Sequence, residues 1–346
     1  MKYTGKIDII ATALEPIIHG AGTSGNTTLL RMQDWIYVDP RGRLVRTRVP
    51  FVSGNSVKHR LRVAAVQYAL DAMGVEDGTL SKPEVDLLFS GGHLNKSGAA
   101  IDLTAARKLS ELFPALSLCG YSAGNAMEES KIACHNLHVV CAENANRTPD
   151  ELRERPDVAP FLALSAGSLR VEEFGTRHDQ ATKRVGRRWL TAAAGEAVAA
   201  RKADKLLGEG DAKPKSKKEK APTAANDRGD SAQMIYDFHA IGAGAKLWGC
   251  VLFAELTELE RAALASAFHY AASGKLNGDL TMGVGAKNSV GYGSISVELR
   301  TSMRITAPQY ATEALANATD SDAGRYAAHL RERKDEIVAA VREAVA

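Results

Sequence analysis

Residues 281–293, with the sequence TMGVGAKNSVGYG, combine small residues with a few polar side chains in a way that suits a ligand-binding loop. Glycine adopts positive φ angles freely and leaves room for another backbone or a phosphate group to approach the chain. Flexible connections have a similar composition, so both interpretations stay open at this point. The glycines in this stretch and just upstream are Gly278, Gly283, Gly285, Gly291 and Gly293.

Two common nucleotide-binding motifs do not fit this stretch. Lys287 precedes Asn288, so the GK[ST] of a P-loop is missing, and Asn288 stands where a G-x-G-x-x-G motif needs its third glycine. The remaining lysine, asparagine and tyrosine suit the sugar-phosphate backbone and the base of a nucleic acid. The predicted RNA-binding residues here are Gly283, Gly285, Lys287, Asn288, Gly291 and Tyr292.

A second candidate site is the stretch 49–62, VPFVSGNSVKHRLR, which predicts a strand end followed by a helix. Apolar residues recur on one side of that helix, and Ser53 or Asn55 can cap its first N–H groups. A helix N-terminus attracts phosphate, and the nearby cations add to the attraction, although such cations could also lie on an exposed helix face. The predicted RNA-binding residues are Ser53, Gly54, Asn55, Ser56, Lys58 and Arg62.

A third basic stretch, residues 174–190, carries five cations between Phe174 and Trp189. Positive charge beside aromatic rings is what single-stranded nucleic acid requires, although a solvated helix face has the same pattern. The following residues, 208–233, are lysine-rich and poor in apolar groups, so we expect a mobile loop that serves as a solubilising segment or a nucleic-acid tether. The predicted RNA-binding residues are Arg177, Lys183, Arg184, Arg187 and Arg188.

The segment CHNLHVVC offers Cys134, His135, His138 and Cys141 as potential zinc ligands. Their spacing matches no common zinc module, and on a strand they would not all point to the same side. We therefore expect buried cysteines and ordinary polar histidines, with no metal and no cofactor.

Composition and charge indicate which classes of partner and compartment are compatible with the sequence. The chain has 346 residues, 45% of them hydrophobic, and a formal net charge of +3, so a polyanion site must come from local clustering of Lys and Arg. Four cysteines without C-x-x-C spacing favour a reducing compartment. The N-terminal residues alternate instead of forming an apolar run, so we expect a cytoplasmic protein without a membrane segment.

The pattern of elements predicts an α+β fold. Strands are expected near residues 6–18, 35–38, 44–49, 234–238, 246–256 and 294–299. Helices are expected after residue 57, over 102–113, after the capping box of Thr257 and Glu260, and from about 320. This order gives a β-α-β-β-α-β frame of the ferredoxin-like or RNA-recognition-motif type, with inserted material.

Four of these places together resemble the RAMP superfamily of CRISPR proteins, in particular its backbone subunit, the "Cas seven" family. Residues 16–22, PIIHGAG, are similar to that family's first glycine turn and add His19, Gly20 and Gly22 to the predicted RNA-binding set. Residues 49–62 resemble the element I-P-G-S-S-L-K-G-x-L-R, and residues 239–244 resemble the turn P-A-G-T-x-F. Residues 283–293 resemble the loop G-G-K-x-S-R-G-Y-G, with Val290 in place of the usual arginine.

The resemblance implies one hand-shaped domain over residues 1–346. Its ferredoxin-like palm would comprise 1–73 and 234–304, its fingers 74–173, its thumb 174–233, and a helical segment 305–346 would follow. It implies a subunit that polymerises along a guide RNA (crRNA), whose pairing with a complementary target nucleic acid reads the sequence. Expected partners are further copies of the chain and other effector subunits: a Cas five-like cap, a large or small subunit, a repeat-processing endonuclease and a helicase.

Type III members of the family cleave RNA with an aspartate after the first strand, but residues 19–33 of this chain contain no carboxylate. We therefore expect a non-catalytic subunit, most similar to type IV (Csf) proteins. Three alternatives stay open: a type III-like backbone subunit, a RAMP endoribonuclease using His19 or His59, and a ferredoxin-like protein that binds a small phosphate ligand.

Overall fold

The computed structural model describes residues 2–39, 41–92, 103–123, 126–177, 234–272, 274–276, 279–305, 310–311 and 320–345. The chain forms two compact units. The larger consists of Met1–Thr23, Thr28–Glu172 and His239–Ala346, and the smaller of Ser24–Thr27 and Glu173–Phe238. Helices and antiparallel strands are mixed along the chain, which confirms the predicted α+β class.

The main sheet is organised around β1 (Tyr3–Ala13), which pairs antiparallel with β12 (Lys246–Leu256) on one side and β15 (Ser294–Ile305) on the other. Within the described residues the strand order is β13-β14-β15-β1-β12-β9-β5-β4, with β16 and β8 pairing off this path. The other strands are β4 (Met32–Val38), β5 (Leu44–Val52), β8 (Ile132–Cys134), β9 (Leu137–Val139), β13 (Gly274–Leu276), β14 (Asp279–Gly283) and β16 (Tyr310–Ala311).

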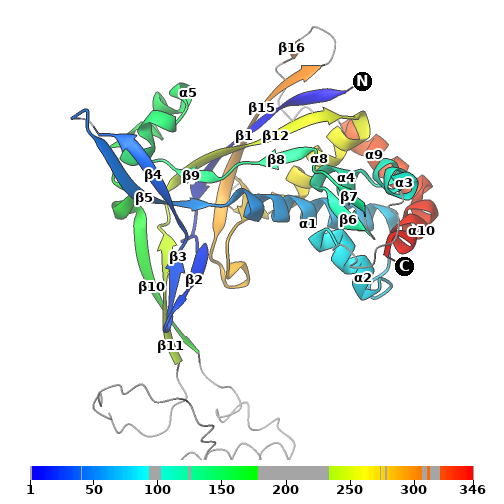
Figure 1. Cartoon of the computed structure of the whole chain (residues 1–346), viewed down its shortest axis with the longest axis horizontal. Helices are drawn as coiled ribbons and strands as arrows, with labels where there is room; N and C mark the ends of the chain where they lie inside the picture. Colours follow the sequence, from blue (N-terminus) through cyan, green and yellow to red (C-terminus); the bar gives the residue numbers. More distant parts are fainter. Residues whose placement is uncertain are drawn as a thin grey trace, which may run out of the picture. The chain divides into compact units, whose positions relative to one another are not determined.

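Two helices pack beside this sheet, α1 (Gly54–Met73) and α8 (Glu258–Ala271) (Figure 1). Ile7 and Ile9 of β1 lie on the same face of the sheet, because alternate residues of a strand share one face. Both are fully buried, in the same hydrophobic cluster as Leu61 of α1 and Leu264 of α8. The main sheet and these two helices form a β-α-β-β-α-β unit. Its elements follow one another along the chain as β1, α1, β9, β12, α8 and β15, and its strands lie in the sheet in the order β15-β1-β12-β9.

The predicted helix boundaries follow local capping chemistry. Ser53 caps α1 by accepting a hydrogen bond from the Ser56 N–H, and Gly74 ends the helix with a left-handed φ of 61°. Thr257 and Glu260 form the predicted capping box of α8. The predicted final helix is two helices, α9 (Asp320–Glu332) and α10 (Lys334–Val345). None of the described helices is long and apolar enough to cross a bilayer.

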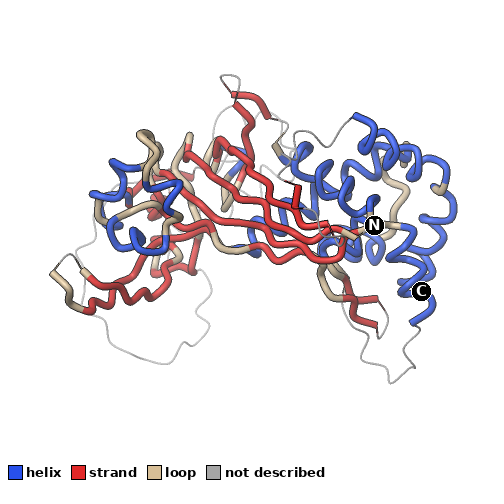
Figure 2. Tube along the Cα trace, turned by 90° about the horizontal axis from the view of Figure 1, so that it is seen from above, coloured by secondary structure: helices blue, strands red, loops and turns tan. Residues whose placement is uncertain are grey.

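The region between α1 and the smaller unit is built from short elements. Its helical pieces are α2 (Lys82–Val85), η1 (Asp86–Ser90), α3 (Leu103–Leu112), α4 (Pro114–Cys119), η2 (Ala142–Arg147), α5 (Asp150–Arg153), η3 (Ala159–Ala163) and η4 (Ala166–Leu169), and its two-stranded sheet is β6 (Tyr121–Ala123) with β7 (Ala126–Glu128). Figures 1 and 2 show helices at both ends of the main sheet, with α2, α3 and α4 at one end and α5 at the other. We predicted residues 74–173 as an inserted fingers region, but β8 and β9 from this range pair with β12, so part of it belongs to the main sheet.

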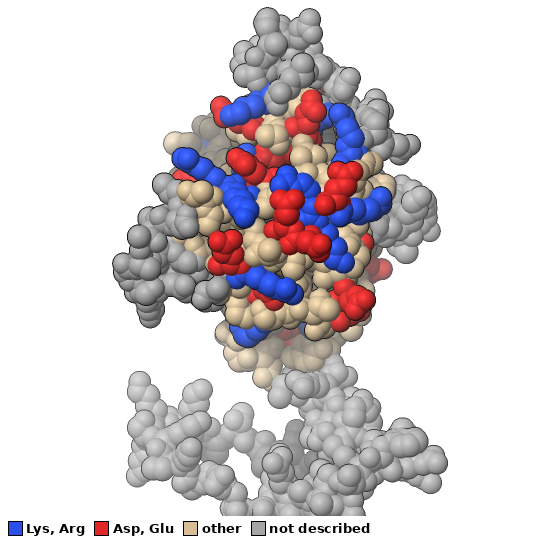
Figure 3. Space-filling model, turned by 90° about the vertical axis from the view of Figure 1, so that its right-hand side faces the viewer, with Lys and Arg blue, Asp and Glu red and all other residues tan. Residues whose placement is uncertain are grey.

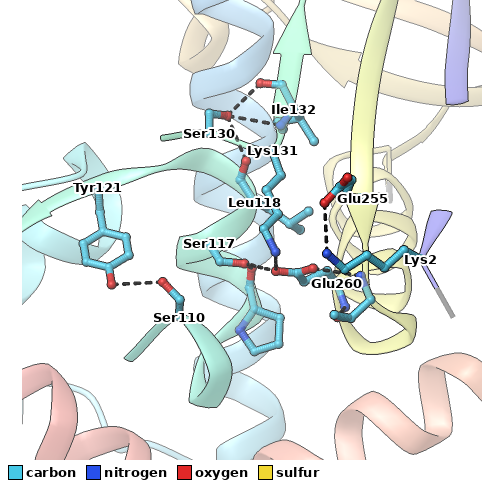
Figure 4. Close-up of polar contacts among 12 residues, drawn as sticks. Lys2, Ser110, Ser117, Leu118, Tyr121, Ser130, Lys131, Ile132, Glu255 and Glu260 are labelled. Carbon is cyan, nitrogen blue, oxygen red and sulfur yellow. Dashed lines mark hydrogen bonds and ion pairs between the residues drawn. The ribbon is translucent and has the colours of Figure 1, made fainter. Parts of the chain in front are cut away.

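A buried carboxylate ties three of these elements together (Figure 4). Glu260 accepts hydrogen bonds from Lys131 Nζ at 2.6 Å, from Ser117 Oγ and from the Thr257 N–H at 2.8 Å. Burial raises the pKa of Glu260, but these hydrogen bonds outweigh burial and hold the pKa below its ordinary value. The start of α8, α4 and the residue before β8 are thereby fixed to one another.

A four-stranded sheet has the order β10-β11-β3-β2, formed by β2 (Gly20–Ser24), β3 (Thr27–Leu30), β10 (Arg170–Arg177) and β11 (Met234–Ile241). Within the smaller unit, Thr27 Oγ1 donates a hydrogen bond to Asp237 Oδ1 at 2.8 Å. The predicted thumb, 174–233, falls in this unit, but residues 178–233 lie outside the described residues, so the thumb stays a prediction.

Candidate functional site

Three motifs that are far apart in the sequence meet at the segment directly after β1. The Ile17 N–H donates a hydrogen bond to the Ile241 carbonyl at 2.8 Å, which brings in the predicted turn at 239–244. The Ala286 N–H donates to the Ile18 carbonyl at 2.8 Å, which brings in the glycine-rich loop. The backbone of residues 17 and 18 therefore joins these two stretches into one structure.

The glycine-rich loop, residues 283–293, owes part of its glycine content to its own packing. Gly285 has φ 72°, and a Cβ there would lie 2.4 Å from the Ile18 carbonyl oxygen. Gly293 has φ 73°, and a Cβ there would lie 1.9 Å from the Val284 carbonyl oxygen. The sequence left open whether another backbone or a phosphate approaches these glycines, and at Gly285 and Gly293 the protein's own carbonyl groups do so. Gly291, with φ 97°, has open space around it and could still face a ligand.

Asn288 fills the inside of the same loop. Its Nδ2 donates hydrogen bonds to the Val284 carbonyl at 3.0 Å and the Tyr292 carbonyl at 2.8 Å. Its Oδ1 accepts a hydrogen bond from Nη2 of Arg60 on α1. The neighbouring Lys287 has a left-handed φ of 60°, which is uncommon for a residue with a side chain. The loop is therefore held in one shape from within, and it is tied to α1 by Arg60.

His19 connects the segment after β1 to the start of α1. Its Nε2 accepts a hydrogen bond from the Ser53 N–H at 3.1 Å, so the ring is neutral and its proton is on Nδ1. Burial, and then the nearby Arg31, lowers the pKa of His19 to about 4. Because the Nε2 lone pair is already used, His19 is poorly placed to act as a general base at neutral pH. This observation weakens the endoribonuclease alternative as far as it depends on His19.

The first turn of α1 packs closely on the segment that follows β8. The Gly54 N–H donates to Asn136 Oδ1 at 2.9 Å, and a Cβ at Gly54 would lie 1.9 Å from the Cys134 carbonyl oxygen. Asn55 is exposed, and Ser56 is half-buried. The predicted residues Ser53 and Gly54 therefore shape the helix start through the cap and through this close packing.

The cations of α1 divide into two kinds. Arg62, which we predicted to bind RNA, is buried, and its Nη2 donates to the carbonyls of Cys119 and Gly120 at 2.9 and 2.8 Å, at the end of α4. Lys58 and Arg60 are half-buried. The sequence signal for burial of Arg62 is its place in the apolar row that continues at Val66, Ala69 and Met73.

These cations have no acidic partner in the part of the chain that the structure describes. Within the described residues, no carboxylate oxygen lies within 4.0 Å of Lys58, Arg60 or Arg62. The sequence of α1 contains no Asp or Glu before Asp71. Charge that is partly removed from water and lacks a counter-charge is unfavourable, so this end of α1 is suited to an anion. On the face shown in Figure 3, by contrast, basic and acidic side chains intermingle.

The remaining predicted residues lie around or outside this site. Gly20 accepts hydrogen bonds from the Arg31 side chain at 3.3 Å, and Gly22 has φ 113° with open space around it. Arg177 is at the end of β10, where the structure describes the backbone. Lys183, Arg184, Arg187 and Arg188 lie outside the described residues, as do the residues 208–233.

The four potential zinc ligands lie on strands β8 and β9 or within two residues of them. In the described part of the chain, Cys134, His135, His138 and Cys141 form no group that brings three ligand atoms within 4.8 Å of one another. His138 contacts Arg147 and lies 5.5 Å from the Trp248 ring, and burial lowers its pKa to about 3. Burial raises the pKa of Cys134 and of Cys141 to about 12. Cys134 and Cys141 therefore have protonated thiols, whereas the thiolate is the form that binds metals, and His135 is exposed.

Comparison with known proteins gives similarities in structure. No protein-family model matches the sequence, and no curated protein matches it. A chain of a type IV-B CRISPR complex has 16% identity, a TM-score of 0.49, and a match that covers 88% of this chain and 92% of that chain. Csc2 of Thermofilum pendens has 11% identity, a TM-score of 0.38, and a match that covers 99% of this chain and 81% of that one.

Proposed function

We propose that this chain is a non-catalytic RNA-binding subunit that assembles along a guide RNA in a CRISPR effector complex, of the type IV kind. The observation that carries the proposal is the pair of half-buried α1 cations, Lys58 and Arg60, which have no carboxylate partner among the described residues. They lie at the end of α1 that is bonded to the glycine-rich loop through Arg60 and to the segment after β1 through Ser53. A polyanion supplies the missing negative charge, and single-stranded RNA has the regular phosphate spacing that a helix start and an adjoining loop can follow.

The proposed RNA contacts come from residues that surround this junction. Lys58, Arg60 and Lys287 would face phosphates, and Tyr292 would contact a base or sugar. The open space at Gly291 and the exposed Asn55 would let the strand approach the backbone. Arg62 is left out of this set because its guanidinium supports α4.

The domain assignment is part of the same proposal. The β-α-β-β-α-β unit would serve as an RNA-recognition-motif-like palm that carries the site. The smaller unit would be the thumb, and the short elements between α1 and β8 would be the fingers. A guide held in this way reads its target by base pairing, so the protein needs backbone contacts and little sequence readout.

Two observations favour binding over catalysis. Residues 19–33 contain no carboxylate for metal or acid-base chemistry, and the Nε2 of His19 is occupied by the Ser53 N–H. A small phosphate ligand is less well supported, because Gly285 and Gly293 accommodate the protein's own carbonyl groups.

The proposal is tested by titrating labelled single-stranded RNA with the wild type and with the Lys58→Ala/Arg60→Ala/Lys287→Ala variant at several KCl concentrations. We expect the variant to bind more weakly to all sequences, with a log–log salt slope smaller by about 2, or about 0.7 for each lost phosphate contact. Arg331→Ala, an exposed position on α9, is the control. Equal affinity and equal slopes for the triple variant and the wild type would refute the proposed site.

A further inference from the structure

Arg60 occupies an unusual position for an arginine. It is half-buried on α1, its Nη2 donates to Asn288 Oδ1 across 228 positions of sequence, and no carboxylate in the described chain lies within 4.0 Å of it. A neutral amide oxygen orients a guanidinium but does not cancel its charge.

Asn288 is fixed more firmly than an ordinary loop side chain. Both hydrogens of its amide group have acceptors, the carbonyls of Val284 and Tyr292. Those two bonds decide which way the amide faces, so Oδ1 must point toward Arg60. The space for the side chain comes from glycine, because a Cβ at Gly293 would lie 2.7 Å from Asn288 Nδ2 and one at Gly283 would lie 3.3 Å from Asn288 Cγ.

The guanidinium of Arg60 retains most of its binding capacity in this position. An arginine has five N–H donors in a planar fork, and the bond to Asn288 uses one of them. The remaining donors and the full positive charge can meet a phosphate, which arginine binds in a bidentate manner. Arg62 lacks this freedom, because Nη2 is bonded to two carbonyls and a Cβ at Gly91 would lie 2.8 Å from Nη1.

We propose that Asn288 is a positioning residue that holds Arg60 against the glycine-rich loop, and that Arg60, rather than Arg62, delivers the α1 charge to a phosphate of the bound strand. The inference rests on the proposed function, and it assigns separate roles to two arginines two positions apart. It also explains why the loop carries an asparagine at its centre: a carboxylate there would neutralise Arg60, and an apolar residue would release it.

The test compares Arg60→Gln, Asn288→Ala and the double variant in titrations of labelled single-stranded RNA across a series of KCl concentrations. Arg60→Gln keeps an N–H donor for Asn288 but removes the charge. We expect it to weaken binding about tenfold or more at low salt and to reduce the salt slope by about 0.7. Asn288→Ala should weaken binding in the same direction, and the double variant should bind no more weakly than Arg60→Gln, because the two residues act as one unit.

Three controls separate a phosphate contact from a structural role. Arg60→Lys keeps the charge and should retain the wild-type salt slope with partly reduced affinity. Arg331→Gln removes an exposed charge elsewhere and should change neither quantity appreciably. Circular dichroism and thermal unfolding show whether each variant is folded before its affinity is compared.

The outcomes distinguish the inference from the proposed function. An unchanged salt slope for folded Arg60→Gln, with RNA binding by the wild type intact, would overturn the inference alone. Fully additive losses for Arg60→Gln and Asn288→Ala would remove the positioning role of Asn288. Absence of RNA binding by the wild type at low salt would overturn the proposed function and the inference together.

Discussion

The Nε2 atom of His19 accepts a hydrogen bond from the backbone N–H of Ser53 at 3.1 Å. This bond joins the segment after the first strand of the sheet to the N-cap of α1, 34 positions later. It requires an unprotonated ring nitrogen, and burial together with Arg31 keeps the ring neutral by lowering its pKa to about 4. The local geometry of the candidate site is therefore linked to pH.

The free energy of unfolding should fall as pH falls from about 6.5 to about 4. In this window the unfolded chain, with an ordinary histidine pKa of about 6.5, binds a proton that His19 in the folded protein does not. The His19 contribution is complete above pH 6.5 and is lost progressively below it. We expect the free energy of unfolding, measured with urea at several pH values, to depend less on pH in His19→Gln than in the wild type. The difference between the two slopes should correspond to at most one bound proton. The pKa of His138 is also lowered, but His138 is present in both proteins. Equal slopes of unfolding free energy against pH for the wild type and His19→Gln would therefore contradict the prediction.

Two glycines of the site should tolerate no side chain. At Gly54 and Gly293 a Cβ would lie 1.9 Å from a backbone carbonyl oxygen, and Gly293 also has a left-handed φ of 73°. We expect Gly54→Ala and Gly293→Ala each to lower the free energy of unfolding by about 2 kcal/mol or more. Gly324→Ala, in α9 with nothing within 4 Å, is the matched control and should stabilise slightly. Chemical denaturation of the three variants measures these effects, and a harmless Gly293→Ala would show that the loop can adopt another shape.

Arg60 and Arg62 should differ in their effects on stability as well as on binding. Arg62→Met removes two hydrogen bonds to the carbonyls that end α4 and leaves those carbonyls in a buried setting, at a cost of about 2–3 kcal/mol. Arg60→Met removes one bond from a half-buried site and should cost about 1 kcal/mol or less. The midpoints of denaturant unfolding of the two variants measure these costs, provided that the m-values equal that of the wild type. Equal costs for the two substitutions would contradict the division of roles.

The four cysteines should react slowly with thiol reagents in the folded protein. Burial raises the pKa of each of them, to about 12 for Cys134 and Cys141, and the thiolate is the reactive form. We expect alkylation at pH 8 to be at least about tenfold slower in the native protein than in denaturant. Mass spectrometry after timed exposure to iodoacetamide locates any exception. Rapid native labelling of Cys134 in β8 or of Cys141 after β9 would show that its thiol is open to solvent.

Much of the frame could be predicted from local patterns. The alternation in β1, the apolar stripe of α1 and the capping box at Thr257 and Glu260 each follow from short-range chemistry, and each is present in the structure. Strands β8 and β9 escaped prediction because each has only three residues and is defined by its pairing with β12, which lies more than 100 residues later.

The glycine-rich and basic stretches of the candidate site are visible in the sequence, but the contacts among their residues are not. Glycines indicated close approach at residues 285 and 293, yet whether a ligand or the protein's own carbonyl makes that approach depends on tertiary contacts. The motif match led us to predict Lys58 and Arg62, and not Arg60, as RNA-binding residues of this helix. The pairing of Arg60 with Asn288 brings together residues from opposite ends of the chain, and no local pattern reports such a contact.

If the proposed function is right, this chain binds single-stranded RNA as a repeated subunit. The most direct measurement is to purify the protein from cells that carry its gene in the native genomic context, determine the size of the particles, and identify any bound nucleic acid by nuclease digestion and sequencing. We expect elongated oligomers containing RNA enriched in CRISPR repeat and spacer sequence. A monomer that carries no nucleic acid, even when purified at low salt, would contradict it.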